Sequence, residues 1–218
     1  MEQRTFDQLS RGGARKGAGR PKPKASGASH GLRERITRHK PAHVTVRVAA
    51  GLPSLRRDGE AWVLNRALIG AAERGDFRIV EYSVMSNHVH LIVEANDGSA
   101  LARGMQSFSV RMAKGLNKLW GRKGKVLADR FHSRLLTTKR EVRNAIAYVL
   151  NNGRKHGMKF GKGELDPHSS AHEFTGWKGF KSKSTRPSLC AAPRAWLLRV
   201  GWRHLGLIDP WATPGMRC

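Results

Sequence analysis

The order of strand-like and helix-like segments constrains the fold of this chain more than any other feature. The run AHVTVRVA, which begins at Ala42, alternates polar and apolar residues and is rich in β-branched side chains, as half-buried strands are. The next run, EAWVLNRALIGAAERG, repeats apolar residues at helical spacing and closes with Gly75, a typical helix stop. Two further strand-like runs follow, FRIVEYSVM and HVHLIVEA, with only Ser86 and Asn87 between them.

A second helix-like run and a fourth strand-like run complete the pattern. Helical spacing returns in ALARGMQSFSVRMAKGLNKLW, which Asp97 or Ser99 would cap and which should end at Gly121. The run VLADRFHSRLL then has the composition of a strand, with an irregularity expected near Asp129. The β-α-β-β-α-β order predicts the α+β class, as a ferredoxin-like split β-α-β antiparallel sheet with helices on one face and the other face left open.

The segment 137–157, TTKREVRNAIAYVLNNGRKHG, predicts one more helix, and this helix carries a tyrosine. Thr137 or Thr138 would cap its start, and Glu141 would complete a capping box with Thr138. Apolar residues at spacing i, i+3, i+4, i+7 give the helix one face to bury: Val142, Ala145, Ile146 and Val149. This C-terminal tyrosine-bearing helix could close over the open face of the sheet.

Changes in composition divide the chain into three parts. Residues 1–41 are rich in Gly, Ala, Lys and Arg and have almost nothing to bury, so we expect a flexible, disordered basic arm. Residues 42–157 contain the whole periodic pattern and should form the folded domain. Residues 158–218 are rich in Gly, Pro, Ser and basic residues and should form a basic C-terminal extension. Its tryptophans could stack on nucleic-acid bases or anchor the extension to the domain: Trp177, Trp196, Trp202 and Trp211.

The charge balance indicates a polyanionic partner. The chain has 41 Lys and Arg residues against 16 Asp and Glu residues, a formal net charge of +25. Solubility alone requires a net charge of only about 2–8 in magnitude in a small domain. Nucleic acid is the commonest partner for so large a basic excess.

The cysteines and the apolar runs exclude several classes of protein. Cys190 and Cys218 are far apart and form no CxxC pair, which argues against a disulfide framework or a structural zinc site. No apolar run approaches the roughly 18 residues of a membrane span, and the first thirty residues lack the apolar core of a signal peptide. We therefore expect a cytoplasmic protein, associated with the nucleoid and with no membrane contact.

Two histidines stand two residues apart in the third strand-like run. His88 and His90 should point to the same side of the sheet, because residues i and i+2 of a strand share a face. Two imidazoles held side by side on a rigid strand could bind a metal ion. They could equally be two half-buried histidines with hydrogen-bond partners.

The final helix brings a phenol and a carboxamide to one flank. Tyr148 and Asn152 are four residues apart, so their side chains are neighbours on a helix. The Asn152 oxygen would suit a third ligand position if His88 and His90 supplied the first two. Each residue also has a plain structural explanation, Tyr148 as a half-buried aromatic residue and Asn152 as a helix C-terminal residue.

These motifs together resemble a known family. SNHVHLIVE, followed about sixty residues later by AYVLNNGRKHG, resembles the HUH single-tyrosine transposases of the insertion sequence 200-like group, and in particular the REP-associated tyrosine transposases. HUH stands for His-hydrophobic-His, and the family's tyrosine helix has the pattern Y-x-x-x-N-P. Here Ser86 replaces a proline that often precedes the first Asn-His pair, and Gly153 replaces the proline after Asn152. The resemblance covers roughly residues 42–157.

The resemblance implies a transposase that nicks and rejoins single-stranded DNA near hairpins through a 5′-phosphotyrosine intermediate. Tyr148 would be the nucleophile, and His88, His90 and Asn152 would hold a divalent metal, Mg²⁺ or Mn²⁺. The alternative is a non-catalytic hairpin nucleic-acid-binding protein descended from such a transposase. Replication initiators and relaxases share the His-hydrophobic-His motif, but in them the nucleophile sometimes precedes the histidines.

Several cations are predicted DNA contacts. Arg20 and Lys22 lie in AGRPKPK, which resembles the minor-groove peptide of AT-hooks, although simple phosphate attraction explains it equally well. Arg130 and Arg134 would share a strand face with His132, which suits phosphate contact. Arg154 follows the Asn152 position. The expected partner is single-stranded DNA with hairpins, bound by a homodimer or by a monomer.

Overall fold

The computed structural model of the chain describes residues 35–72, 74–181 and 188–214. Most of the predicted basic arm, including Arg20 and Lys22, therefore lies outside the described residues. Within residues 35–41, the Ile36 side chain is buried against the main hydrophobic core. None of the helices in the described part of the chain combines the length and the apolar character that crossing a bilayer requires.

The described residues form one antiparallel sheet of four strands, as the segment order predicts. The strands are β1 (Ala42–Arg47), β2 (Phe77–Val84), β3 (His88–Ala95) and β4 (His132–Leu135), in the spatial order β2-β3-β1-β4. All three neighbouring pairs are antiparallel. This order, with β3 between β1 and β2, is that of a split β-α-β sheet, so the predicted α+β class and ferredoxin-like topology are confirmed.

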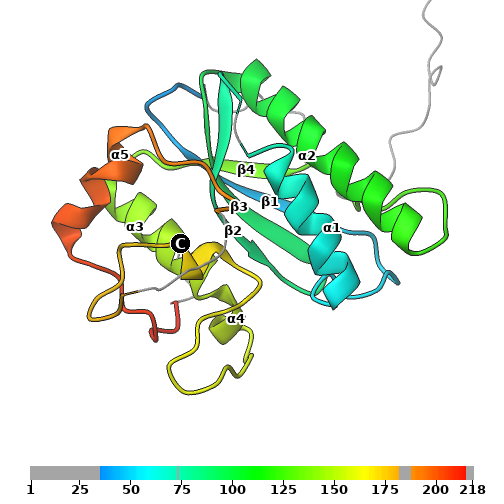
Figure 1. Cartoon of the computed structure of the whole chain (residues 1–218). Coiled ribbons are helices and arrows are strands. Elements are labelled where there is room, and N and C mark those ends of the chain that lie inside the picture. The colour runs from blue at the N-terminus through cyan, green and yellow to red at the C-terminus, as the bar shows by residue number, and fades with distance from the viewer. Residues whose placement is uncertain (1–34, 73, 182–187, 215–218) are drawn as a thin grey trace, which may run out of the picture.

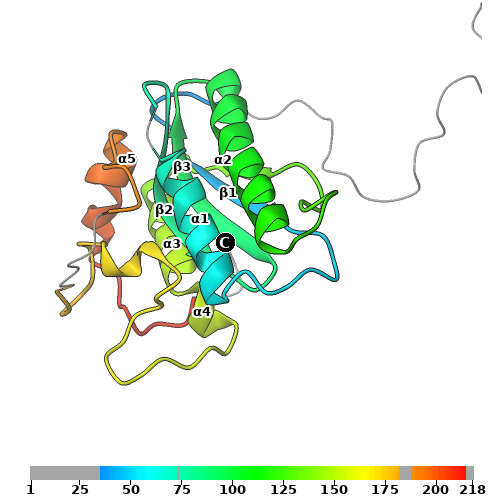
Figure 2. The same ribbon diagram turned by 45° about the vertical axis from the view of Figure 1, so that its right-hand side comes forward.

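Helices α1 (Asp58–Ile69) and α2 (Gly98–Leu119) lie side by side on one face of the sheet (Figure 1, Figure 2). Their backbones approach closely where α2 has Gly115. A Cβ atom there would stand 2.5 Å from a methyl carbon of Val63 on α1. The Asp97 side chain accepts a hydrogen bond from the Ala100 N–H, so Asp97 is the predicted cap of α2.

Helix α3 (Lys139–Leu150) covers the opposite face of the sheet (Figure 1). Its start is the predicted capping box. The Thr138 hydroxyl accepts the Glu141 N–H at 3.1 Å, and the Glu141 carboxylate accepts the Thr138 N–H at 3.2 Å. The face that the β-α-β-β-α-β pattern leaves open is thus closed by the tyrosine-bearing helix, and the sheet lies between two helical layers.

Alternation along the central strand separates two hydrophobic clusters in the described residues. Leu91 and Val93 of β3 pack into the cluster beneath α1 and α2. Ile92 packs into the cluster beneath α3. Because side chains alternate along a strand, His88 and His90 point to the α3 side together with Ile92. The two histidines therefore face the helix that carries Tyr148.

Three predicted elements are shorter than the sequence indicates. Helix α1 ends at Ile69 with Gly70 as its C-cap, so the predicted stop at Gly75 is wrong. The final helix stops at Leu150, and after a turn at Asn151 a separate short helix, α4 (Asn152–Lys155), begins. The fourth strand begins only at His132. Before it the Asp129 carboxylate accepts the Arg130 N–H at 2.7 Å, a local bond that diverts the backbone from the ladder. Arg130 thus lies in a bend ahead of β4 and not in the strand.

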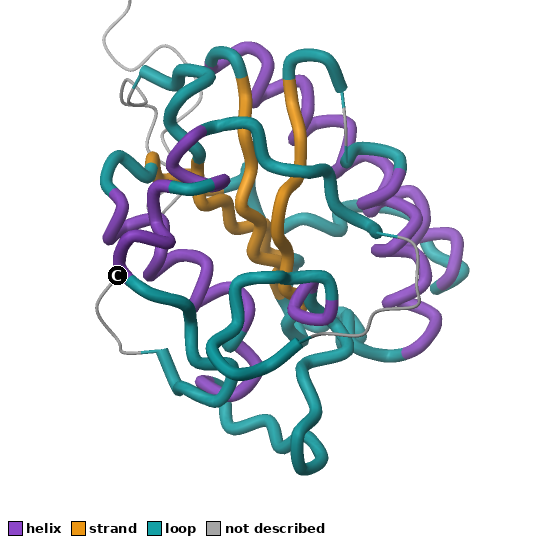
Figure 3. The backbone as a smooth tube through the Cα atoms, turned by 60° about the vertical axis from the view of Figure 1, so that its left-hand side comes forward, coloured by secondary structure: helices purple, strands orange, loops and turns teal. Residues whose placement is uncertain are grey.

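The described part of the C-terminal extension packs against α3 and the edge of the sheet (Figure 3). It contains three short helices, η2 (Ser170–His172), α5 (Trp196–Arg199) and η3 (Gly201–Leu205). The buried Glu94 carboxylate at the end of β3 accepts the N–H groups of Arg194 and Ala195 at 2.8–3.1 Å. Trp177 and Trp202 are buried in the cluster beneath α3, whereas Trp196 and Trp211 are exposed.

Candidate active site

The two predicted ligand histidines lie next to each other on β3. Their ring centroids are 4.7 Å apart and their planes are nearly perpendicular. His88 is half-buried at the start of β3, and His90 is only 5% exposed. In the sheet register His90 stands between Thr45 of β1 and Ser83 of β2, so the sheet holds it firmly from both sides.

Each histidine uses Nδ1 for a hydrogen bond within the protein. Asn87 Oδ1 accepts a hydrogen bond from His88 Nδ1 at 2.7 Å. Nδ1 of His90 lies 3.1 Å from both His43 Nε2 and Thr45 Oγ1. Nε2 of His90 is buried and has no hydrogen-bond partner in the described residues. Histidines that bind metals show this arrangement, in which a partner at one ring nitrogen orients the other toward the ion.

The electrostatic surroundings keep these imidazoles neutral. Burial, followed by the nearby positive charge of Arg47, lowers the pKa of His88 to about 4. Burial, followed by the effect of His43, lowers the pKa of His90 to about 2. The pKa of His43 is likewise lowered to about 4, chiefly by burial. At neutral pH all three rings are therefore uncharged, and the neutral imidazole is the form that can coordinate a cation.

Tyr148 reaches this cluster from the opposing helix. Its ring centroid lies 5.2 Å from that of His90 and 5.7 Å from that of His43. The ammonium group of Lys155, on α4, stands 4.4 Å from the centre of the Tyr148 ring. The phenol is thus surrounded by imidazoles on the sheet side and a cation on the helix side.

Asn152 begins α4 and is fully buried. Neither its side-chain oxygen nor its side-chain nitrogen has a hydrogen-bond partner in the described residues. Leaving such a group unsatisfied costs about 1–3 kcal/mol, and buried orphan groups of this kind concentrate at functional sites. The expected i, i+4 helical relation to Tyr148 is replaced by a turn at Asn151, so α4 sets the direction of the Asn152 side chain.

These donors have the chemistry that a divalent cation needs. Two neutral imidazoles and one amide oxygen form a mixed nitrogen and oxygen set that suits Mn²⁺ and is compatible with Mg²⁺. His90 Nε2 and the Asn152 amide are the buried side-chain polar atoms that lack partners within the described residues. Across the same residues no group of three or more His, Cys, Asp and Glu side chains is arranged for a metal.

The glycine that replaces the family's proline is explained by close packing. A Cβ atom at Gly153 would stand 2.6 Å from Asp166 Oδ2 and 2.8 Å from Phe160 Cζ. Asp166, which is itself buried, is held there by an ion pair with Arg56 at 2.8 Å. The loop that follows α4 therefore occupies the space next to Gly153 and supports the backbone of Asn152.

The cations predicted to contact DNA are placed in different surroundings. Arg134 donates a hydrogen bond to Glu141 at 3.0 Å, beside the start of α3. Arg154 donates a hydrogen bond to the Glu164 carbonyl at 2.7 Å, and its guanidinium packs over the rings of Phe160 and Trp211. Arg154 is therefore directed into the extension, whereas the next residue, Lys155, faces Tyr148.

Three residues near the site were not among the sequence predictions. They are His43, which contacts His90, Lys155, which contacts Tyr148, and His156, whose ring lies 6.1 Å from that of His88. Strand alternation places His43 on the same face of β1 as Thr45. Only the pairing of β1 with β3 makes that face continuous with the histidine pair.

Comparisons with known proteins find a matching family and a structure of similar fold. A protein family described as "Transposase IS200 like" matches residues 42–152. No protein of curated function matches the chain in sequence. A solved structure described as a REP-associated tyrosine transposase bound to a REP hairpin is similar in fold, with a TM-score of 0.52 and 20% sequence identity. The similarity covers 65% of this chain and 82% of that one.

Proposed function

Because the chain belongs to the IS200-like transposase family, we propose that it nicks and rejoins single-stranded DNA near hairpins through a 5′-phosphotyrosine intermediate. One observation carries this proposal. The Tyr148 ring lies 5.2 Å from that of His90, which combines a buried, unpartnered Nε2 with a bonded Nδ1. A nucleophile and an oriented ligand thus come from separate elements to one place.

In this mechanism the Tyr148 oxygen attacks the scissile phosphorus. The phenol loses its proton, a tyrosine oxygen–phosphorus bond forms, and the bond to the 3′ oxygen breaks, leaving a 3′-hydroxyl once that oxygen gains a proton. His88, His90 and Asn152 would hold Mg²⁺ or Mn²⁺, which supplies Lewis-acid polarisation of the phosphate when bound. The positive charge of Lys155 beside the ring favours the phenolate form of Tyr148.

A tyrosine ester suits a reaction that must also run backwards. A phenol has a pKa of about 10, so phenolate is a better leaving group than the alkoxide of a sugar. The phosphotyrosine bond therefore retains the energy of the broken phosphodiester. A 3′-hydroxyl from another DNA end can then displace Tyr148 without an external energy source.

The proposed partner is DNA that contains a hairpin. The net charge of +25 supports a polyanion, and the structurally similar transposase was solved with a REP hairpin bound. Tyr148 and the histidines lie within one chain, which supports a site formed by a monomer. A chromosomal substrate would place the protein in the cytoplasm, in association with the nucleoid.

The test is a covalent adduct assay with a labelled hairpin-bearing single strand. With Mn²⁺ the native protein should give a protein–DNA adduct on a denaturing gel, and Tyr148→Phe should give none. Tyr82→Phe is the matched control, since Tyr82 is the only other tyrosine and lies buried on β2, and it should keep the adduct. An undiminished adduct from Tyr148→Phe would exclude the proposed nucleophile. Metal-independent hairpin binding with no adduct would instead establish the non-catalytic alternative.

A further inference from the structure

The outer side of α2 carries a one-sided charge. The helix contains no Asp or Glu, and its basic residues fall on the side away from the sheet, namely Arg103, Arg111, Lys114 and Lys118. Like charges three and four residues apart on a helix repel one another and destabilise it. This uncompensated repulsion lies far from the histidines and is not required by the packing of α2.

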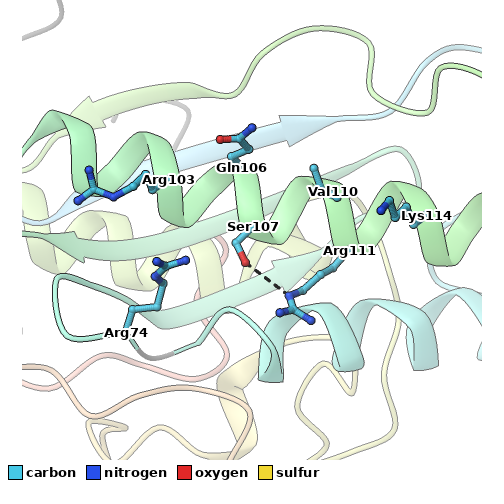
Figure 4. A pocket seen from close by; sticks show the side chains of 7 residues that line it. All are labelled: Arg74, Arg103, Gln106, Ser107, Val110, Arg111 and Lys114. Carbon is cyan, nitrogen blue, oxygen red and sulfur yellow. Dashed lines mark hydrogen bonds between the residues drawn. The ribbon is translucent and has the colours of Figure 1, made fainter.

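The same side of α2 is hollowed. A surface cavity of about 580 Å³ is lined by Arg103, Gln106, Ser107, Val110, Arg111 and Lys114, and by Arg74 from the connection between α1 and β2 (Figure 4). Arg111 extends across the end of α1, where a Cβ atom at Gly70 would stand 2.9 Å from its Nη1. Its Nε lies 3.4 Å from Ser107 Oγ.

Most of the positive charge in this cavity is unneutralised. Asp76 forms an ion pair with Arg103 at 2.5 Å and approaches Arg74 at 3.9 Å. Within the described ranges no acidic side chain forms an ion pair with Arg111 or Lys114. The cavity therefore presents several exposed donors to any anion that reaches it.

An exposed aromatic residue stands on the neighbouring helix. Trp62 of α1 is 62% exposed, and the Arg66 guanidinium lies 5.4 Å from the centre of its ring. Basic grooves that follow a nucleic-acid backbone are commonly accompanied by exposed aromatic rings. The outer face of α1 and α2 thus combines a basic hollow with an aromatic surface.

We propose that this basic face of α2 binds a second segment of the DNA through its phosphates. The proposal rests on the proposed function in that the partner is DNA. The sheet lies between α2 and α3, the helix that contains Tyr148 (Figure 2), so the DNA strand at the active site is not the strand held here. From Arg103 to Lys114 the helix rises about 16 Å, which matches roughly five nucleotides at 3.4 Å each. Phosphate contacts of this kind would position the DNA without reading its sequence.

The test compares two triple variants with the same change in charge. One is Arg103→Gln with Arg111→Gln and Lys114→Gln. The control is Lys159→Gln with Lys162→Gln and Lys178→Gln, which removes three exposed lysines from the extension. Binding of a long hairpin and of a short single strand is measured by fluorescence anisotropy without metal, across a series of salt concentrations.

Each lost phosphate contact removes about 0.9 from the slope of log affinity against log salt. The α2 variant should therefore lose about 2–3 from this slope with the long hairpin, and its affinity at about 0.1 M salt should fall tenfold or more. The control variant should show less than half of this loss in slope and in affinity. The short single strand should bind the α2 variant and the control variant with the same affinity. The double variant Arg103→Lys with Arg111→Lys keeps the positive charge and should bind the long hairpin as the native protein does. Circular dichroism is used to check that each variant is folded.

An α2 variant that binds the long hairpin with native affinity and salt slope would overturn the proposal. So would an equal loss in the control, because the effect would then follow from net charge alone. The two proposals fail separately. If the native protein forms no adduct but the α2 variant loses hairpin affinity, the catalytic proposal is wrong and the α2 binding surface is supported. If the native protein forms the adduct but the α2 variant binds the hairpin as the native protein does, the catalytic proposal is supported and the α2 binding surface is wrong.

Discussion

At the scale of single residues, the candidate site depends on side chains that orient other side chains. His43 and Thr45 lie on β1 and contact Nδ1 of His90. A hydrogen bond at one ring nitrogen determines which nitrogen is left to coordinate a metal. We therefore expect these two residues to affect the proposed metal site, although neither is a proposed ligand.

Replacing His43 should weaken metal binding without removing a ligand. We expect His43→Ala to lower Mn²⁺ affinity by about 10–100-fold, the usual effect of losing a partner behind a ligand. Titration of free Mn²⁺ by electron paramagnetic resonance measures this without any DNA. His204→Ala, at an exposed position on η3, is the matched control and should bind Mn²⁺ normally. Native affinity in His43→Ala would show that Thr45 alone orients His90.

The buried histidines also predict how stability depends on pH. The pKa is lowered to about 4 for His43 and His88 and to about 2 for His90, whereas an unfolded histidine titrates near 6.5. Between these values the unfolded chain binds more protons than the folded chain. The free energy of unfolding should therefore fall as the pH drops from about 7 toward 4.

Urea unfolding at pH 7.5 and at pH 5 measures this dependence. His90→Asn retains a polar group but cannot take up the proton, so the variant should lose less stability than the native protein between the two pH values. The comparison isolates the histidine, because carboxylates that titrate in the same range are common to both proteins. Equal losses in the two proteins would contradict the neutral, buried state of His90.

At the scale of elements, the start of α3 determines where Tyr148 lies. The capping box of Thr138 and Glu141 holds the first turn, and Glu141 also accepts hydrogen bonds from Thr137. Hydrogen bonds from Thr137, more than any other cause, lower the pKa of Glu141 to about 2. This carboxylate therefore stabilises the helix above about pH 4.5 and loses that effect as the pH falls toward 2.

Removing the cap should destabilise the protein by a measurable amount. Thr138→Ala should lower the free energy of unfolding by about 1 kcal/mol, the typical cost of a lost N-cap. Ser99→Ala is a suitable control, because Ser99 is exposed in the first turn of α2, where Asp97 is the cap. Urea unfolding should show almost no change for the control. A similar change in both variants would mean that the capping box contributes nothing specific.

The elements also show where sequence reasoning succeeds. The helices and β1 bury one regular face, whereas β2 and β3 are apolar runs buried on both faces of the sheet. These local patterns predicted every strand of the sheet and helices α1, α2 and α3. They did not predict the turn at Asn151, where the Asn151 amide donates a hydrogen bond to the Asp209 carbonyl. That partner is distant in sequence, so a local sequence pattern cannot predict the contact.

At the scale of the whole molecule, the described part of the C-terminal extension belongs to the packed structure. Trp202 is 1% exposed and stacks on Phe174, with ring centroids 5.5 Å apart. Both lie in the hydrophobic cluster that also contains the buried face of α3. The extension therefore supports the helix that carries Tyr148, even though its sequence has no regular period.

Truncating Trp202 should cost far more than truncating an exposed tryptophan nearby. Trp202→Ala should lower the free energy of unfolding by about 3–5 kcal/mol, the range for a large aromatic residue removed from a core. Trp196→Ala, at a position 52% exposed, should cost less than about 1 kcal/mol. Urea unfolding followed by circular dichroism compares the two. Equal and small losses would mean that the extension is not integral to the folded chain.

The amino-acid sequence alone determined the class of fold, the element order and the likeness to a transposase family. The likeness to the family rests on the short motifs SNHVHLIVE and AYVLNNGRKHG. For the fold class and the element order, local periodicity is sufficient, because an element with one buried face must repeat apolar residues at its own period. It also placed His88 and His90 on one strand face, since alternation along a strand is a local property.

The tertiary structure alone decided which residues meet. The sheet order β2-β3-β1-β4 brings His43 beside His90, and the packing of α3 on the second face brings Tyr148 to both. The docking of the extension turns Arg154 away from the site and leaves Lys155 beside the phenol. These contacts join residues far apart in the chain, and only the balance of burial over the whole molecule selects them.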